Sequence, residues 1–118
     1  MASIQREIYG DFDFLLHDIH DAVTGGSISA TYEGGTDITR EGVRISVRTF
    51  ERYSLLSSNR VSMTVTLVGK KGMGKHTLYA VCSGASQGVF FKLNTSGELA
   101  FLDKMRAFCE SRQQKIKE

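Results

Sequence analysis

The stretch VSMTVTLVGKKGMGKHTLYAV, residues 61–81, alternates apolar and polar side chains on both sides of a turn rich in glycine and lysine. A repeat of two residues is the pattern of a half-buried β-strand, whereas an amphipathic helix repeats its apolar side chains every three or four residues. Strands that follow one another through a short turn pair antiparallel. The stretch therefore predicts a β-hairpin within an antiparallel sheet.

The turn of this hairpin raises a second interpretation, because Gly69–Lys75 fits the first seven positions of the phosphate-binding pattern G-x-x-x-x-G-K-[ST]. The eighth position holds His76, where magnesium binding requires a serine or threonine hydroxyl. The residues that follow continue a strand, although a phosphate-binding loop leads into a helix. We therefore favour a hairpin turn in which Gly72 and Gly74 allow positive φ angles.

Four further segments outside the hairpin have the composition of strands. Residues 27–32 and 43–48 alternate apolar and polar side chains as the hairpin does. Residues 88–93, GVFFKL, are a further candidate strand, and a short strand is also expected at residues 6–9. The two hairpin strands, residues 27–32 and residues 43–48, with residues 88–93 as the candidate fifth, predict a sheet of four to five strands, and the short strand at residues 6–9 would precede them.

Two segments repeat their apolar side chains at helical spacing instead. In residues 11–23, Asp11 can accept the first free amide hydrogen bonds of a helix, and Gly25 can end it. A second amphipathic helix is expected within residues 94–114, close to the end of the chain. The sheet is thus flanked by an N-terminal and a C-terminal helix.

This order of elements predicts an α+β fold in which both helices pack on one face of the antiparallel sheet, a two-layer sandwich. A curved version, with the last helix held in the concave face as in a helix-grip fold, is the alternative. At 118 residues and 13.1 kDa, the chain has the size of a single domain, residues 1–118.

Composition and motifs exclude several classes of function. Hydrophobic residues at 41 % and charged residues at 24 % are typical of globular proteins, and we expect a cytoplasmic location because no signal peptide or membrane-spanning run is visible. Cys82 and Cys109 have no partners at metal-binding spacing, so we expect buried thiols. His17 and Asp21 are expected on a solvated helix face. No catalytic residue, metal or cofactor is predicted.

A row of arginines at every fourth position gives the clearest surface hypothesis. Arg40, Arg44, Arg48 and Arg52 are an even number of residues apart, so in a regular strand they share one side, opposite Val43, Ile45 and Val47. We expect this row on the open face of the sheet, as a solvated polar surface or as a surface that binds single-stranded nucleic acid. The candidate nucleic-acid residues are Arg44, Arg48, Phe50, Arg52, Phe90 and Lys92.

A second candidate site surrounds Glu51, whose carboxylate falls on the apolar side of its segment and is expected to pair with a neighbour such as Arg60. Arginines would supply charge, Glu51 and Tyr53 orientation, and a glycine-flanked loop hydrogen bonds. A purely structural role, holding a long hairpin in register, is the other interpretation. The candidate ligand-binding residues are Arg48, Glu51, Arg52, Tyr53, Arg60, Ser83, Ser86 and Gln87.

Four blocks carry a resemblance to a known family: GDFDFLLHDI, VRISVRTFERYS, SNRVSMTVTL and CSGASQGVFFKLNTSGELAFLDKM. The chain resembles a family of short uncharacterised bacterial proteins, a domain of unknown function, over nearly its whole length. The resemblance implies no reaction, cofactor or catalytic residue. It implies that the segments 51–54, 58–62 and 83–87 belong to one recurring design, for folding or for function.

These observations lead to two hypotheses of different classes. The first is a non-enzymatic cytoplasmic module that binds a small anionic ligand or a protein partner, including a second copy of itself. The alternative is single-stranded nucleic-acid binding through the arginine-rich sheet face. An enzymatic function has the least support from the sequence.

Overall fold

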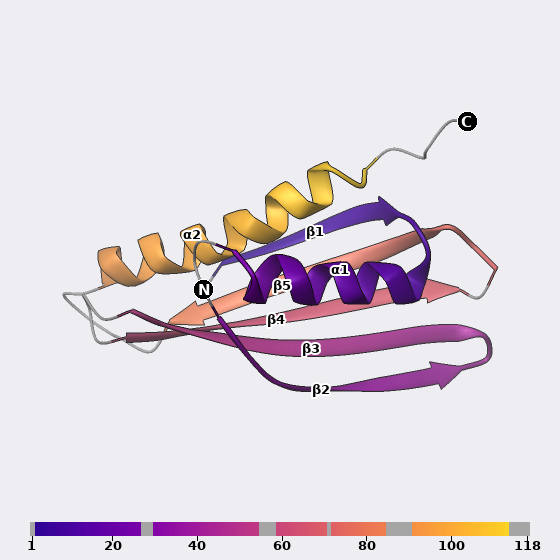
Figure 1. Cartoon of the computed structure of the whole chain (residues 1–118), viewed down its shortest axis with the longest axis horizontal. Helices are drawn as coiled ribbons and strands as arrows, with labels where there is room; N and C mark the ends of the chain where they lie inside the picture. Colours follow the sequence, from indigo (N-terminus) through magenta and orange to yellow (C-terminus); the bar gives the residue numbers. More distant parts are fainter. Residues whose placement is uncertain (1, 27–29, 55–58, 71, 85–90, 114–118) are drawn as a thin grey trace.

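A computed structural model describes residues 2–26, 30–54, 59–70, 72–84 and 91–113, with the backbone alone for residues 54, 59 and 91–100. The described residues form five strands and two helices (Figure 1). In chain order they are β1 (Ala2–Tyr9), α1 (Phe12–Thr24), β2 (Thr31–Arg40), β3 (Val43–Ser54), β4 (Asn59–Lys70), β5 (Lys75–Gly84) and α2 (Phe91–Glu110).

All five strands form one antiparallel sheet in the order β1-β5-β4-β3-β2. The predicted α+β fold and the strand number are therefore confirmed. The hairpin that the stretch 61–81 predicts is β4 and β5, with Val65 directly opposite Ala80. The β2–β3 turn, the β4–β5 turn and the start of α1 all lie at the same end of the sheet (Figure 1).

The fifth strand is not the one that GVFFKL suggested. Residues 91–93 begin helix α2, and residues 88–90 lie outside the described residues. The edge of β5 that a further strand would need is occupied by β1, which pairs with it from Ala2 to Tyr9 and is longer than expected. A short apolar run cannot distinguish a strand from a buried helix segment, so the sequence alone left this choice open.

Both helices cover the same face of the sheet. Helix α1 buries Phe12, Leu15, Ile19 and Val23, at the spacing that the sequence predicted. Helix α2 packs on β1, β4 and β5 and also contacts α1. The sheet residues beneath the helices include Ile8, Met63, Leu67, Leu78 and Ala80, which are fully buried.

The expected position of the arginine row on the open face is wrong. Arg44, Arg48 and Arg52 lie directly opposite Gly69, Val65 and Val61 of β4, which are buried under the helices. Residues directly opposite in an antiparallel pair share a face, so the three arginines face the helices. An alternating pattern fixes which residues share a side, but it does not say which side is covered.

The prediction also placed Val43, Ile45 and Val47 on the covered side of the sheet. This is wrong as well, because the three residues lie on the open face. Arg40 is directly opposite Val43 and also lies there, so it does not belong to the row. Arg40 is separated from the row because a two-residue turn lies between β2 and β3, and the turn residues Glu41 and Gly42 have φ angles of 50° and 82°. Positive φ at both turn positions is typical of a type I′ hairpin.

Candidate functional site

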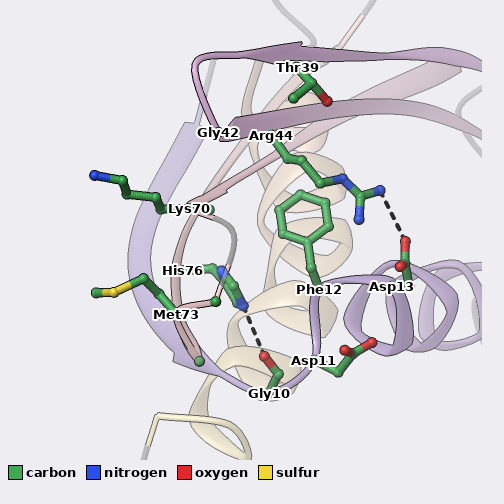
Figure 2. A pocket seen from close by; sticks show the side chains of 13 residues that line it. Gly10, Asp11, Phe12, Asp13, Thr39, Gly42, Arg44, Lys70, Met73 and His76 are labelled. Carbon is green, nitrogen blue, oxygen red and sulfur yellow. Dashed lines mark hydrogen bonds and ion pairs between the residues drawn. The ribbon is translucent and has the colours of Figure 1, made fainter.

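A pocket of about 660 Å³ lies at the end of the sheet where α1 begins (Figure 2). It is bounded by the β1–α1 junction, the β2–β3 turn and the β4–β5 turn. The residues that line it are Gly10, Asp11, Phe12, Asp13, Thr39, Gly42, Arg44, Gly69, Lys70, Gly72, Met73, Gly74 and His76. Five of these are glycines, so backbone rather than side chains forms much of the wall.

The local backbone geometry explains why glycine occupies several of these positions. Gly10 has a φ of 148°, which L side chains rarely adopt, and it lets the chain leave β1 and enter α1. Its amide donates to the Gly74 carbonyl at 3.0 Å, which ties the start of α1 to the β4–β5 turn. Gly72 has a φ of 84°, so the positive angle expected there is confirmed, whereas none is found at Gly74. No atom lies within 4 Å of an added Cβ at Gly42, Gly72 or Gly74.

His76 forms one wall of the pocket and is only 4 % exposed. Its Nε2 lies 2.9 Å from the Gly10 carbonyl oxygen. A carbonyl can only accept, so Nε2 carries the proton and Nδ1 is the acceptor of the neutral ring. Nδ1 is buried, and among the described residues it has no hydrogen-bond partner. The ring is held in place by packing on one side and a hydrogen bond on the other.

The packing of His76 explains why position 69 holds a glycine and why the Phe12 ring lies against the imidazole. A Cβ added to Gly69 would lie 2.1 Å from Nδ1 of His76 and 2.9 Å from a ring carbon of Phe12, so a side chain there would overlap both rings. Phe12 meets the imidazole edge-on, with ring centroids 5.3 Å apart and planes at 88°. Such edge-to-face contacts favour a fixed geometry, and here they join α1 to β5.

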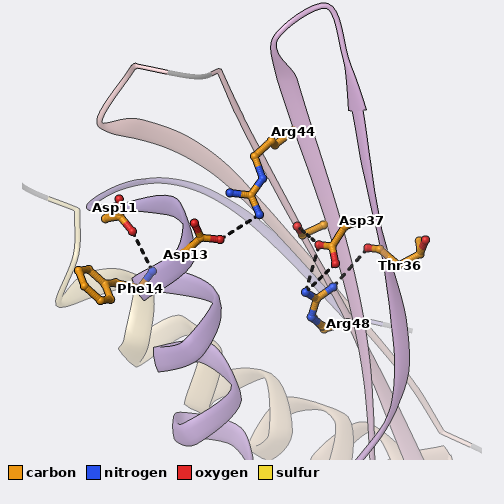
Figure 3. Close-up of polar contacts among 8 residues, drawn as sticks. Asp11, Asp13, Phe14, Thr36, Asp37, Arg44 and Arg48 are labelled. Atoms are coloured by element: carbon orange, nitrogen blue, oxygen red, sulfur yellow. Dashed lines mark hydrogen bonds and ion pairs between the residues drawn. The ribbon is translucent and has the colours of Figure 1, made fainter.

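Arg44 is the main charged group of the pocket. Its guanidinium carbon lies 4.2 Å from the centroid of the Phe12 ring, and its Nη2 lies 3.0 Å from Oδ1 of Asp13 (Figures 2 and 3). The Arg44 side chain is 33 % exposed, whereas that of Asp13 is 73 % exposed. The arginine is thus held against an aromatic ring, while its carboxylate partner stands largely in solvent.

The start of α1 adds to the electrostatics of the pocket, whereas the Lys70 side chain points away from Arg44 (Figure 2) and belongs to the open face, opposite Val43. Asp11 caps the helix by accepting a hydrogen bond from the Phe14 amide at 3.1 Å. The amides of Phe12 and Asp13, in the first turn, have no carbonyl one turn earlier to bind. These amides and the helix dipole favour an anion at this end of the helix, although Asp11 and Asp13 supply negative charge of their own.

The candidate ligand-binding residues that the sequence singled out do not form one site. Arg48 and Arg52 face the helices, whereas Glu51, Tyr53 and Arg60 lie on the open face. Ser83, directly opposite Ser62, also lies on the open face, and Ser86 and Gln87 lie outside the described residues. The expected pairing of Glu51 is confirmed, since Nη1 of Arg60 donates to its carboxylate at 2.9 Å.

The candidate nucleic-acid residues are also separated. Phe50 is fully buried, beside the rings of Tyr32 and His20, so its ring offers no surface for a base to stack on. Phe90 lies outside the described residues, and Lys92 is in α2 rather than on a strand. Among the described side chains of the residues singled out for the two sites, only that of Arg44 lines the pocket.

Arg48 belongs to a separate polar cluster on the β2–β3 hairpin (Figure 3). Its guanidinium donates to both oxygens of Asp37, at 3.1 and 3.2 Å, and the Ser46 hydroxyl donates to the same carboxylate. The Ser46 hydrogen bond, followed by the contact with Arg48, holds the pKa of Asp37 below its ordinary value. The cluster joins the two strands and satisfies its own charges.

The structure also describes the His17 and Asp21 side chains and the two cysteines that the sequence singled out. His17 pairs with Asp21 at 3.2 Å on the exposed side of α1. Within the described ranges, no group of three His, Cys, Asp or Glu residues could hold a metal ion. Cys82 and Cys109 are buried, and burial raises the pKa of the Cys109 thiol to about 11. No helix in the described part of the chain is long and apolar enough to cross a membrane.

Comparison with known proteins agrees with the resemblance found in the sequence. Residues 1–113 match the Family of unknown function (DUF6054). The chain belongs to this family. No curated protein and no solved structure matches it. The pocket is therefore interpreted from its own residues.

Most pocket residues were missed by reasoning from sequence alone. The glycines of Gly69–Lys75 were recognised as a turn, but nothing in the sequence places this turn beside the turn at Gly42. That requires the strand order β1-β5-β4-β3-β2, which brings both turns to the start of α1. The available signal was His76, a polar residue at an inward position of a strand, although the sequence pattern drew attention to it only as the eighth position of the phosphate-binding motif.

Proposed function

We propose that this domain is a non-enzymatic binding module and that its ligand is a small molecule with an acidic group, bound in the pocket between α1 and the two turns. The observation that carries the proposal is the Arg44 guanidinium, held over the Phe12 ring at the pocket wall. An arginine fixed in this way offers a planar set of donors that fits a carboxylate or phosphate.

The shape and lining of the pocket support a small ligand. Its volume of about 660 Å³ falls within the range of roughly 300–1,000 Å³ that is usual for small-molecule sites. Phe12, Met73 and the glycine backbone supply apolar surface, Arg44 supplies positive charge, and Asp11 and Asp13 supply negative charge at the start of α1. Sites of this type bind the body of a ligand by apolar contact and orient it with a few polar groups.

The same lining favours binding over catalysis. Thr39 carries the one hydroxyl among the side chains that line the pocket, and no cysteine lines it. The Nε2 atom of His76 is engaged by the Gly10 carbonyl, and Nδ1 is buried against Gly69. A nucleophile with an adjacent base, the usual arrangement for covalent catalysis, is thus not assembled among these residues.

The proposal is tested with 2-naphthoate and phenyl phosphate, two aromatic acids that fit a pocket of this size. Gly74→Leu adds a large apolar side chain to the pocket lining without backbone strain, because among the described residues, chain neighbours aside, no atom lies within 4 Å of an added Cβ at Gly74. We expect either acid to raise the thermal unfolding temperature of the wild type by several degrees at saturation, where 100 times Kd adds about 2.7 kcal/mol. Gly74→Leu should abolish this shift.

Gln5→Leu is the matched control, because it adds a similar apolar group on the exposed face of β1, outside the pocket. It should respond to both acids as the wild type does. The proposal fails if neither acid stabilises the wild type, or if Gly74→Leu and Gln5→Leu respond equally.

We also propose that the uncovered face of the sheet binds a second copy of the chain. Across its middle the face carries apolar and threonine side chains, with Ile38 and Tyr79 about two-fifths exposed. Five strands at about 4.8 Å spacing and about 3.3 Å per residue give a face on the order of 700 Å², close to the roughly 800 Å² that each partner buries in a stable complex.

The charges at the two ends of this face favour a second copy as the partner. Arg40, Lys70 and Lys75 lie at the end with the turns, where Glu7 pairs with Lys75 at 3.6 Å, and Glu33 and Glu51 lie at the other end, beside Arg60. When two copies pack with their strands in opposite directions, each basic end faces an acidic end. The cytoplasmic location expected from the sequence stays a prediction.

A further inference from the structure

The Arg44 guanidinium already binds a carboxylate in this structure, that of Asp13. A single contact of 3.0 Å joins Nη2 to Oδ1, and the Phe12 ring covers one face of the guanidinium. Arginine has five N–H donors, and among the described residues Asp13 is the one carboxylate paired with Arg44. The Arg44 guanidinium is therefore held in an orientation that suits an acidic group, and its contact with Asp13 uses only part of its donor set.

The two partners of this ion pair are held very differently. Arg44 is at the start of β3, a strand paired on both sides, and packs on Phe12, whereas the Asp13 side chain projects from the first turn of α1 and is 73 % exposed. An ion pair this exposed contributes about 0–1 kcal/mol. If Asp13 turned away, its carboxylate would still lie at the helix N-terminus, where negative charge is favourable.

We infer that Asp13 is an internal competitor, whose carboxylate occupies the place on Arg44 that the acidic group of the ligand takes when it binds. The inference rests on the proposed function of the pocket and adds the class of its ligand, which is a carboxylate or phosphate attached to an aromatic ring. The acidic group of this ligand would bind Arg44, and its ring would lie beside Phe12 and Met73. Asp13 then sets the affinity, because each binding event must first break its ion pair.

The inference predicts opposite effects for the two residues of the ion pair. Asp13→Asn keeps the size of the side chain and removes the competing charge, so 2-naphthoate should bind about three- to tenfold more tightly. Arg44→Gln should weaken 2-naphthoate binding by about tenfold or more. The neutral 2-naphthamide has the same ring system without the charge, and neither substitution should change its affinity by more than about twofold.

Isothermal titration of both compounds at one ionic strength measures these affinities. Asp21→Asn is the matched control, because it removes a carboxylate from the same helix at an exposed position paired with His17, away from the pocket. It should leave 2-naphthoate binding unchanged. Arg44→Lys, which keeps the charge but not the planar donors, serves as the second variant at Arg44 if Arg44→Gln unfolds, and it should also bind more weakly.

The outcomes separate the inference from the proposed function. Tighter binding of 2-naphthoate by Asp13→Asn alone supports the competitor. Equal binding by the wild type and Asp13→Asn, abolished by Gly74→Leu, overturns the competitor and leaves the pocket in place. No binding of 2-naphthoate by the wild type or by Asp13→Asn overturns both.

Discussion

At the scale of single residues, the pocket wall depends on His76 and on the space that Gly69 leaves for it. The imidazole fits between the β4 backbone and the Phe12 ring, and its hydrogen bond to Gly10 fixes its orientation. Because Phe12 also supports Arg44, the position of His76 determines where the guanidinium can lie. A substitution at Gly69 is therefore expected to displace the Arg44 guanidinium as well.

Gly69→Ala tests this packing directly. The new Cβ would lie 2.1 Å from His76 Nδ1, so the rings must shift, and we expect the free energy of unfolding to fall by about 1–3 kcal/mol. Gly74→Ala is the control, because nothing lies within 4 Å of its added Cβ. Urea unfolding compares the two variants with the wild type. Equal stabilities for the two alanine variants would contradict the packing described here.

Asp37 is the residue whose titration should affect stability at low pH. The Ser46 hydroxyl and the Arg48 guanidinium favour the ionised carboxylate, so its pKa is lower in the folded protein than its ordinary value of 3.8. A group with a lowered folded pKa contributes stability above its unfolded pKa and loses it as pH falls through the folded pKa.

The corresponding variant is Asp37→Asn. It should be less stable than the wild type between about pH 5 and 7, and the difference should shrink below about pH 4 as the wild-type carboxylate becomes protonated. Urea unfolding across this pH range measures the difference. A difference in unfolding free energy that stays constant down to pH 2 would show that the pKa of Asp37 is not lowered by folding.

At the scale of elements, the two helices and the β4–β5 hairpin could be predicted from periodicity, because their apolar faces are buried wherever the structure describes the side chains. Asp11 and Gly25 cap α1 as expected, the Asp11 side chain accepting from the Phe14 amide and the Gly25 amide donating to the Asp21 carbonyl. The face of β3 that carries the arginines could not be predicted. Both sides of β3 mix apolar and polar residues, and the side that is covered depends on where α1 packs.

The candidate site could be predicted only in its separate parts for the same reason. The glycines of the β4–β5 turn and the arginine at position 44 were recognised individually, but the pocket exists because strand order brings the β1–α1 junction and two turns together. Contacts such as that of Gly10 with Gly74 join residues far apart in the chain. Local sequence patterns carry no information about which distant turns become neighbours.

At the scale of the whole molecule, the sheet has one face covered by both helices and one face without a cover (Figure 1). The uncovered face has an uncharged centre, and its charged residues lie at the two ends, where Lys75 pairs with Glu7 and Arg60 pairs with Glu51, as in a protein interface with a polar rim. Pocket and open face lie on different sides of the sheet. A ligand in the pocket therefore leaves the open face free for a second copy.

Ile45→Lys tests self-association, because it places a charge among the apolar side chains of the open face, opposite Ile38 and Val68. We expect sedimentation velocity to show a dimer for the wild type at about 100 μM and a monomer for Ile45→Lys, since an unpaired charge is not tolerated at the core of an interface. Phe14→Lys is the control, because Phe14 is 72 % exposed on α1, away from the open face. It should stay dimeric, and a monomeric wild type would contradict the proposed interface.

The most direct test of the central claim is a nitrogen-15 NMR titration of the protein with 2-naphthoate. If the pocket is the binding site, the amide signals of Gly10, Phe12, Gly42, Gly72 and Gly74 shift and saturate together, while those of Thr64 and Thr66 on the open face stay in place. Shifts confined to the open face, or an unchanged spectrum at millimolar 2-naphthoate, would contradict the account.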